Sequence, residues 1–333
     1  MKIAVVILNW NGTKLLEQFL PSIVKYTPEA NIYLADNAST DDSIAFVKTN
    51  FPTVRIIRNE SNLGFAQGYN DALKSVDAEI FALVNSDVEV TENWLQSIIV
   101  TFENEPNTAI IQPKILDYKR KEFFEYAGAA GGFMDKYGYM FCRGRIFETL
   151  EKDNGQYDDN CKIFWASGAC FFIRSSIFDE LKGFDADFFA HQEEIDLCWR
   201  AFNKGHEIKF NSQSIVYHVG GATLQLGNPK KTFLNFRNSL LMLVKNLPKK
   251  QLIPIIFTRL ILDGIAGIKF LFQGEFKYVL AILKAHFAFY AHFYKHYKKR
   301  GAFQSKKYYN TKSIVYLYFI KGINIFNSNF GSK

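Results

Sequence analysis

The chain has 333 residues, of which 48% are hydrophobic and 22% charged, so it can bury a full core and is not a disordered protein. Its four cysteines form no C-x-x-C pair, and no secretory signal precedes the first apolar run. We therefore expect reduced thiols inside a cell and no zinc bound by a cysteine cluster.

The net charge of +7 is distributed unevenly along the chain. Residues 249–333 contain 15 Lys and Arg against two acids, which leaves residues 1–248 with a net charge of −6. An acidic body with a basic, aromatic tail indicates an enzyme that rests on an anionic surface, and it favours membrane lipid over nucleic acid as the partner.

Four short apolar runs in the first part of the chain each stop at small polar residues. Segments with apolar residues at helical spacing follow them, which is typical of βαβ units. This alternation predicts a doubly wound α/β sheet with a ligand crevice along the carboxyl ends of its strands. The predicted strands are residues 2–8, 31–35, 54–57 and 80–84.

The loops after these strands are rich in amides and carboxylates. Asp87, after the fourth strand, is suited to bind a divalent metal or a sugar hydroxyl, although alone it would be interpreted as a turn residue capping a helix. Asp36, after the second strand, is placed to accept hydrogen bonds from a ribose or base. The first loop, NWNGTK, has a single glycine, so the G-x-G-x-x-G signature of dinucleotide-binding folds is missing.

The second half of the chain contains further short strands, predicted at residues 109–112, 169–173 and 214–217. Gly168, just before one of them, would allow close approach by a sugar or an acceptor. Residues 114–160 are irregular and rich in Gly, Tyr and Phe. They fit either acceptor contacts or a long surface excursion that covers the far end of the sheet.

A helix predicted from about Glu193 carries three acids within its first four residues, while Ile195 and Trp199 are spaced to face the core. Acids are favoured at helix N-termini by the helix dipole, but three exceed what capping requires. His218, at a strand end, could be a metal ligand or part of the scaffold.

Five motifs occur in the order ILNWNG, LADNASTDDS, NLGFAQGYN, LVNSDV and FFAHQEEIDLCWR. Together they resemble the inverting family 2 glycosyltransferases of the GT-A fold, and most of all their rhamnosyltransferase-like bacterial branch, over about residues 2–247. The resemblance implies a Rossmann-like mixed sheet flanked by helices. It also implies transfer of a sugar from a UDP- or dTDP-sugar, dTDP-rhamnose among them, to a hydroxyl of a glycan or lipid-linked glycan in surface polysaccharide synthesis.

The resemblance also implies roles for individual residues. Glu194 would be the catalytic base, with Glu193 as the second candidate, and Asp196 would contact an acceptor hydroxyl or orient the helix. Asp87 and His218 would hold Mg or Mn. Asn85 replaces the first acid of the family's D-x-D motif, and its neutral oxygen favours weaker metal binding. Donor contacts are expected from Asn9, Trp10, Asn11, Asp36, Asn37, Ser39, Asn62, Gly64, Phe65, Gly68, Asn70, Asn85, Ser86 and Asp87.

The tail is expected to be helical. A helix at residues 231–247 would bring Arg237 and Asn238 near the phosphates or the acceptor. Residues 252–272 are long enough to span a bilayer, but Arg259, Asp263 and Lys269 disfavour spanning and favour an interfacial helix. The next helix has an apolar stripe and lysines on another face. A helical subdomain packed on the body or on a second subunit is the alternative.

The sequence therefore predicts a glycosyltransferase domain at residues 1–248, with a nucleotide-sugar half at 1–112 and an acceptor half at 113–248. A membrane-associating helical region would follow at 249–333, on the cytoplasmic side of the cell membrane. Two other classes stay open at this point: a non-catalytic nucleotide-sugar or glycan-binding protein, and an interaction protein that docks through its basic tail.

Overall fold

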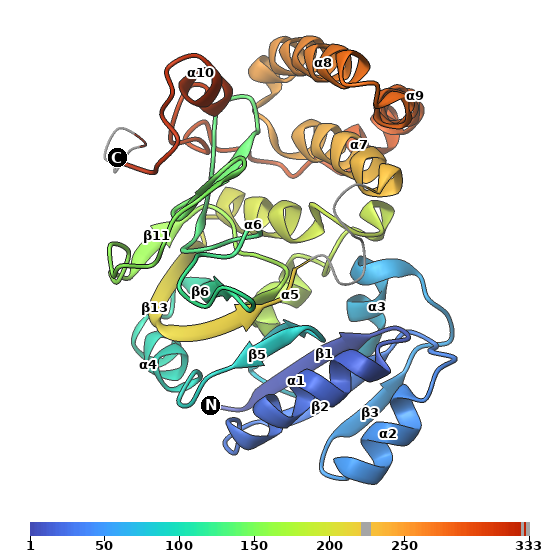
Figure 1. The fold of residues 1–333 in the computed structure, drawn as a ribbon, viewed down its shortest axis with the longest axis vertical. Coiled ribbons are helices and arrows are strands. Elements are labelled where there is room, and N and C mark those ends of the chain that lie inside the picture. Colours follow the sequence, from blue (N-terminus) through green and yellow to red (C-terminus); the bar gives the residue numbers. More distant parts are fainter. Residues whose placement is uncertain (221–227, 328–329, 331–333) are drawn as a thin grey trace.

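A computed structural model describes residues 1–220, 228–327 and 330. One nine-stranded sheet runs through the body, with helices on both of its faces, and a cluster of helices from the end of the chain lies beyond it (Figure 1). In spatial order the strands are β11 (Cys161–Ile163), β13 (Glu207–His218), β6 (Thr108–Asp117), β12 (Cys170–Arg174), β4 (Ile80–Asn85), β1 (Ile3–Asn9), β2 (Asn31–Asp36) and β3 (Arg55–Arg58).

The four predicted N-terminal strands are confirmed, and they form the parallel half of the sheet. β1 pairs in parallel with both β2 and β4, and β2 pairs in parallel with β3. The register sets Asn9 beside Asp36 and Leu8 beside Asn85, so the loops after three strands meet at one edge. The other half is mixed, because β12 runs antiparallel between β4 and β6. The short strand β5 (Val88–Val90), which pairs with β13, was not predicted.

Alternating side chains of β1 enter two separate cores. Ile3, Val5 and Ile7 pack on the face covered by α1, whereas Ala4 and Val6 pack on the face covered by α3. This double coverage explains why the strand is apolar along its whole length. The helices that flank the sheet are α1 (Thr13–Lys25), α2 (Ser43–Asn50), α3 (Gly64–Leu73), α4 (Gln96–Asn104), α5 (Ser175–Glu180) and α6 (Glu193–Asn203).

The irregular segment 114–160 is not a surface excursion. It begins in β6 and then forms a second, four-stranded sheet whose side chains Phe133 and Phe141 are buried in the main core, as is Phe124 just before it. Its glycines and aromatic residues therefore serve tight turns and packing. The strands of this small sheet are β7 (Gly132–Met134), β8 (Met140–Cys142), β9 (Arg145–Ile146) and β10 (Thr149–Leu150).

The tail is helical as predicted, and it packs on the body. Leu252, Ile255 and Phe289 belong to the same core as the small sheet and α6. Lys295 pairs with Asp187 of the body at 2.7 Å. The tail and the body therefore share one hydrophobic core. The predicted domain boundary at residue 248 stays a prediction. The tail helices, with α7 just before them, are α7 (Pro229–Asn246), α8 (Lys249–Phe272), α9 (Phe276–Lys298) and α10 (Ile314–Phe319).

The charged face of α8 packs on the protein and its apolar face is exposed. Arg259 and Asp263 are 3% and 1% exposed and point into the protein, whereas Phe257, Ile261 and Ile265 are more than half exposed. Within the described residues, no helix has both the length and the apolarity needed to cross a bilayer.

Candidate active site

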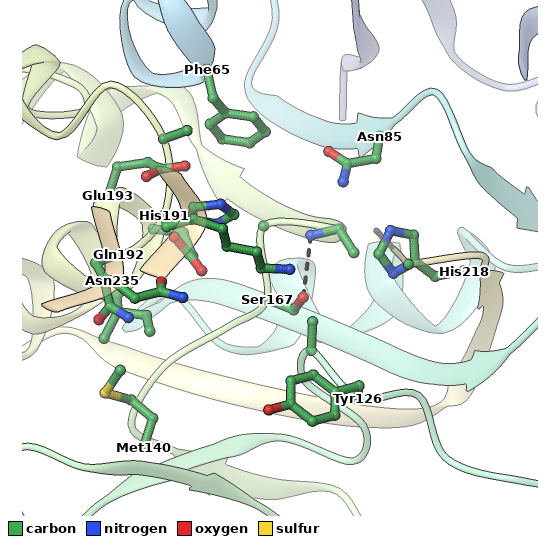
Figure 2. A pocket seen from close by; sticks show the side chains of 18 of the residues that line it. Phe65, Asn85, Tyr126, Met140, Ser167, His191, Gln192, Glu193, His218 and Asn235 are labelled. Atoms are coloured by element: carbon green, nitrogen blue, oxygen red, sulfur yellow. Dashed lines mark hydrogen bonds between the residues drawn. The ribbon is translucent and has the colours of Figure 1, made fainter. Parts of the chain in front are cut away.

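One cavity of about 1350 Å³ opens where the sheet edge, the small sheet and the tail helices meet (Figure 2). Residues of the large sheet, of the small sheet and of helices α3, α6, α7 and α8 line it, so motifs far apart in the sequence come together. Predicted site residues that line it are Asn9, Trp10, Asn11, Asn37, Asn62, Gly64, Phe65, Asn85, Ser86, Asp87, Glu193, Glu194 and His218.

Asp36 does not reach the cavity, so its predicted contact with the nucleotide is corrected. It is fully buried behind Asn9, whose Nδ2 donates to its Oδ1 at 3.0 Å. The backbone N–H of Ser39 donates to the other oxygen, and the Ser39 hydroxyl accepts from the backbone N–H of Asn11. Asp36 and Ser39 thus hold the two loops that present Asn9, Asn11 and the half-exposed indole of Trp10 to the cavity.

The loop at the start of α3 meets the loop before α6. Gly64 has φ +88°, and a Cβ there would lie 2.5 Å from the carbonyl oxygen of Phe189, which accepts from the backbone N–H of Phe65. Two residues predicted to border the donor serve packing instead. A Cβ on Gly68 would lie 2.5 Å from Asn37, and the Asn70 amide bonds both backbone groups of Phe184 at 2.9 Å.

A buried chain of charged side chains lies at the carboxyl end of β4 and β13. His218 Nε2 is 3.2 Å from Asp87 Oδ1, and His218 Nδ1 is 3.3 Å from Glu125 Oε1. Burial disfavours the charged imidazole, but the two carboxylates outweigh it and raise the pKa of His218 to about 10. All three residues line the cavity, beside Asn85 and Ser86.

Asp87 and His218 could share a divalent metal, which would have to displace the proton from Nε2 of His218, because only the neutral imidazole is a ligand. Ligands at about 2.1 Å on neighbouring positions of one ion lie about 3 Å apart, close to the separation of these two atoms. Glu125 is placed to orient the imidazole. In the part of the chain that the structure describes, no group of three or more His, Cys, Asp or Glu side chains could hold a metal alone. Substrate or water oxygens would have to complete the site.

The loop before α6 is strained and clamped. Phe189, His191 and Gln192 have φ of 65°, 69° and 76°, in the left-handed region that is unfavourable for residues other than glycine. The side-chain amide of Asn238 on α7 donates to the carbonyl oxygens of Ala190 and His191 at 3.0 and 2.7 Å. The clamp fixes the direction in which α6 begins.

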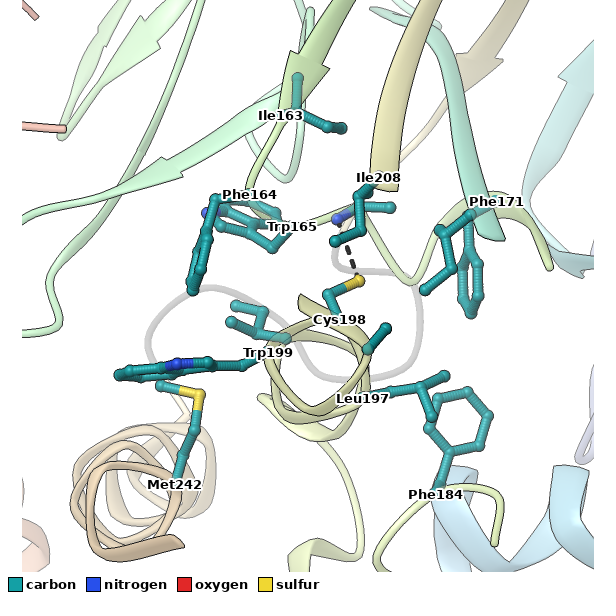
Figure 3. Close-up of a cluster of buried hydrophobic side chains, with 14 of the residues drawn as sticks. Ile163, Phe164, Trp165, Phe171, Phe184, Leu197, Cys198, Trp199, Ile208 and Met242 are labelled. Carbon is teal, nitrogen blue, oxygen red and sulfur yellow. Dashed lines mark hydrogen bonds between the residues drawn. The ribbon is translucent and has the colours of Figure 1, made fainter. Parts of the chain in front are cut away.

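The body of α6 is anchored in the core, where Leu197, Cys198 and Trp199 point in three directions into apolar surroundings (Figure 3). Trp199 is fully buried, contacts Phe164 edge-on and stacks on Tyr308 of the tail at 4.9 Å. Because the helix cannot rotate, its first turn must face the cavity.

The two glutamates at the start of α6 differ in their surroundings. Burial raises the pKa of Glu194 to about 7, although backbone hydrogen bonds oppose the shift. Glu194 is half-buried and lies beside Gly168, where a Cβ would be 3.6 Å from its carboxyl carbon. Glu193 is 3% exposed, and burial together with the charges of Glu194 and Asp196 raises its pKa well above the ordinary value. Burial therefore favours the neutral form of both carboxyl groups, and Glu193 is also disfavoured as an anion by the charges of Glu194 and Asp196.

Of the two roles predicted for Asp196, contact with an acceptor hydroxyl is wrong and orientation of the helix is the one that its contacts support. It does not line the cavity, and its carboxylate accepts from Arg200 at 2.7 Å, Lys245 at 2.8 Å and Asn246 at 2.9 Å. Despite its burial, Lys245 and Arg200 hold the pKa of Asp196 below the ordinary value. The expectation that Arg237 and Asn238 lie near phosphates is also corrected, because both bond the backbone of the loop before α6.

The family model described as "Glycosyl transferase family 2" matches residues 4–182, more than half of the chain. The chain belongs to glycosyl transferase family 2. This confirms the resemblance and makes the protein a glycosyltransferase, so the two non-enzymatic alternatives are set aside.

Two curated relatives of this family 2 glycosyltransferase also act on sugars. An N-acetylglucosaminyl-diphospho-decaprenol L-rhamnosyltransferase of Mycobacterium tuberculosis is 24% identical over 228 residues, which are 62% of this chain and 73% of that protein. The low-salt glycan biosynthesis hexosyltransferase Agl10 of Haloferax volcanii is 20% identical over 83% of this chain and 87% of that protein.

The GT-A fold of the family 2 glycosyltransferase is confirmed by its structural neighbours. The structure of GalNAc-T7 with UDP, GalNAc and Mn²⁺ superimposes with a TM-score of 0.58 at 18% identity, over 75% of this chain and 48% of that chain.

Sequence patterns missed three cavity residues of the family 2 glycosyltransferase. Glu125 and Arg145 lie in the irregular segment, where no periodicity indicated which side chains turn inward. His191 lies within a quoted motif and received no role, yet it lines the cavity, and burial lowers its pKa to about 4.

We expect Asp196→Ala to lower the free energy of unfolding by about 2 kcal/mol, because it removes the buried carboxylate that Arg200, Lys245 and Asn246 contact, while Lys245 keeps Asp185 at 2.7 Å. Urea denaturation followed by circular dichroism measures the change. Asp77→Ala, which removes a 94% exposed carboxylate paired with Lys2, is the control and should leave the midpoint unchanged. Equal midpoints for both variants would contradict the orienting role.

Proposed function

We propose that the protein transfers a sugar with inversion from a UDP- or dTDP-sugar to a hydroxyl of a glycan or lipid-linked glycan acceptor. The observation that carries the proposal is the placement of Glu194, a carboxyl group with a pKa of about 7, in the same cavity as the Asp87–His218 pair. A base whose pKa lies near the working pH is the group that such a transfer requires.

In the proposed reaction, the acceptor oxygen attacks the anomeric carbon of the donor from the side opposite the diphosphate. The new carbon–oxygen bond forms as the bond to the diphosphate oxygen breaks, and the electron pair leaves with the diphosphate. The acceptor proton passes to Glu194. Glu193 lies beside it with a raised pKa, which favours a neutral carboxyl group that can donate a hydrogen bond.

Asp87 and His218 would hold a divalent metal, Mg or Mn, together with donor phosphate oxygens. A bound metal neutralises the charge that develops on a leaving diphosphate. Asn85 lies beside them and has only a neutral amide oxygen. The protein would therefore offer the metal one carboxylate and one imidazole. We assign the amides of Asn9, Asn11, Asn37 and Asn62 to the nucleotide, since they line the same cavity.

The proposed donor and pathway follow the relatives. The Mycobacterium tuberculosis protein is by name a rhamnosyltransferase that acts on a diphospho-decaprenol sugar, and the Haloferax volcanii protein is a glycan biosynthesis hexosyltransferase. These names support a dTDP-rhamnose-type donor and a role in surface polysaccharide synthesis for this chain.

We also propose that α8 and α9 bind the cytoplasmic face of the cell membrane. Their outward residues are 49–87% exposed and apolar, and Lys277 and Lys284 lie on the same helices. Apolar side chains inserted between lipids, with lysines near anionic headgroups, are typical of peripheral membrane binding. The outward residues are Ile253, Phe257, Ile261, Ile265, Ile268, Phe272, Phe276, Leu280, Leu283, Phe287, Tyr290 and Tyr294.

Glu194→Gln should lower kcat on the order of a thousandfold, because the amide cannot accept the proton. Donor binding, measured by calorimetry with UDP and dTDP, should change less than twofold. Glu180→Gln, on the exposed side of α5, is the matched control and should keep full turnover. If Glu194→Gln keeps its turnover while Glu193→Gln loses it, the base is Glu193. Absence of both transfer and nucleotide binding in the unaltered protein, across a panel of donors, would overturn the proposed function.

The pH dependence of kcat/KM should report the Glu194 carboxyl group. Its raised pKa means that the active, ionised form is lost as the pH falls through about 7, so the rate should drop tenfold per pH unit below about 6. Rates measured from pH 5 to 9 test this. A profile that stays flat down to pH 5 would exclude Glu194 as the base.

Flotation with liposomes tests the membrane proposal. The Phe272→Glu/Phe287→Glu variant should partition at least about tenfold less onto phosphatidylglycerol-containing vesicles, because it places charge in the apolar layer. Val100→Glu, a similarly exposed apolar residue on α4, is the control and should float like the unaltered protein. Equal flotation of all three proteins would show that the contact lies elsewhere.

A further inference from the structure

The cavity extends away from the donor loops toward the small sheet and α8. Six residues define this distal lobe: Tyr139, Met140, Arg145, Phe147, Arg259 and Ala266. Met140 and Tyr126 lie on the side of the cavity opposite Phe65 and Asn85 (Figure 2). The donor loops belong to the large sheet, whereas the walls of the distal lobe belong to β8, β9 and α8. The distal lobe is therefore a separate part of the site.

Arg145 lies in the distal lobe without a direct ion-pair partner among the described residues, although Glu125 and Glu148 line the same cavity. The residue is 8% exposed. Its Nε donates to the carbonyl oxygen of Tyr126 at 2.8 Å, its Nη2 contacts Cys142 Sγ at 3.7 Å, and its guanidinium lies over the Tyr126 ring. Across the described residues, no carboxylate lies within 4.0 Å of Arg145, and its Nη1 has no hydrogen-bond partner.

In the described residues, the other buried lysines and arginines each lie close to a carboxylate, unlike Arg145. Lys114 lies 2.7 Å from Asp153, Arg143 lies 2.8 Å from Asp159, Lys245 lies 2.8 Å from Asp196, and Arg259 lies 3.7 Å from Asp263. A buried charge is costly unless it is paired, so an anion is needed to complete the surroundings of Arg145. Because Arg145 lines the cavity, that anion can come from a substrate.

The rim of the distal lobe leads to exposed apolar surface. Phe147 packs against Phe319 of α10 with ring centroids 5.2 Å apart, and Lys269 of α8 lies over the same ring. Phe319 and Ile320 are 56% and 70% exposed, and Phe272 at the end of α8 is 87% exposed. A molecule with an anionic head and an apolar chain matches this succession of a buried guanidinium and an exposed apolar rim.

We propose that Arg145 binds a phosphate of a lipid-linked acceptor, a prenyl-diphosphate saccharide whose chain leaves the cavity past Phe147 toward α8 and α10. The inference rests on the proposed function, and it names the acceptor class and the residue that recognises it. Guanidinium groups recognise phosphate oxygens through paired, charge-assisted hydrogen bonds, and the free Nη1 of Arg145 is available for them.

Binding of farnesyl diphosphate, which has the proposed head and a short chain, tests this without turnover. Calorimetry should show that Arg145→Gln weakens farnesyl diphosphate binding at least tenfold and that Arg145→Lys, which keeps the charge but not the fork, weakens it less. UDP binding should change less than twofold in both variants. Farnesol, which lacks the diphosphate, should bind the unaltered protein and Arg145→Gln equally weakly.

Arg120→Gln is the matched control, since Arg120 also lines the cavity but is 52% exposed and paired with Asp117. It should change the affinity for farnesyl diphosphate less than twofold.

If Arg145→Gln weakens UDP binding instead, the residue serves the donor and the inference is overturned. It is equally overturned if neither ligand responds, or if the unaltered protein binds UDP but not farnesyl diphosphate. If Arg145→Gln unfolds at a lower temperature than the unaltered protein, the test uses Arg145→Lys instead. Weaker binding of farnesyl diphosphate with unchanged UDP binding then supports the inference, and any other result overturns it. Failure of UDP and dTDP to bind the unaltered protein would count against the proposed function itself.

Discussion

The buried ion pair between Asp196 and Lys245 is the interaction on which the site depends. It joins α6 to α7 at a point where neither charge reaches water, and Arg200 and Asn246 satisfy the remaining oxygen positions. Because Lys245 also pairs with Asp185 at 2.7 Å, the ion pair belongs to a buried network that fixes the register in which α6 packs on α7. That register places the first turn of α6 against the cavity. α7 also supplies Asn238, which clamps the strained loop before α6. The strain of that loop and the direction of its glutamates are therefore set by α7, a helix outside the parallel sheet.

Much of the fold and the strand-end side of the cavity could be predicted, because parallel strands bring their carboxyl ends to one edge whatever their separation in the chain. This reasoning located Asn9, Asn85 and Asp87 correctly. It failed for Asp36, which lies at the same edge. Asp36 and Asn9 are register partners, so their side chains bond each other, and it is Asn9 that faces the cavity. Strand positions follow from hydrophobic patterns, but the side chain that is turned inward depends on neighbours that only the packed structure defines.

Long-range partners were beyond prediction for the same reason. Glu125 lies in a segment without periodicity, and nothing in its local sequence indicates that it meets His218. In α8, the spacing correctly separated Arg259 and Asp263 from the apolar residues, yet it could not indicate which face packs on the body. The structure turns the charged face inward, where Arg259 bonds the carbonyl oxygens of Tyr137 and Gly138, and leaves the apolar face exposed. Periodicity defines two faces, but their orientation requires knowledge of the partner surface.

The buried cations differ in whether a carboxylate lies next to them. Lys114, Arg143 and Lys245 are each paired with a carboxylate and lie away from the cavity, whereas Arg259 is paired with Asp263 and lines it. Glu193 and Arg145 are buried without a counter-ion, and both line the cavity. A folded chain tolerates an uncompensated buried charge only where something else completes it, either a proton or a ligand. For Glu193, burial raises the pKa and so favours the neutral, protonated form. Arg145 cannot lose its proton, since the guanidinium stays charged, so a ligand is the remaining way to complete it.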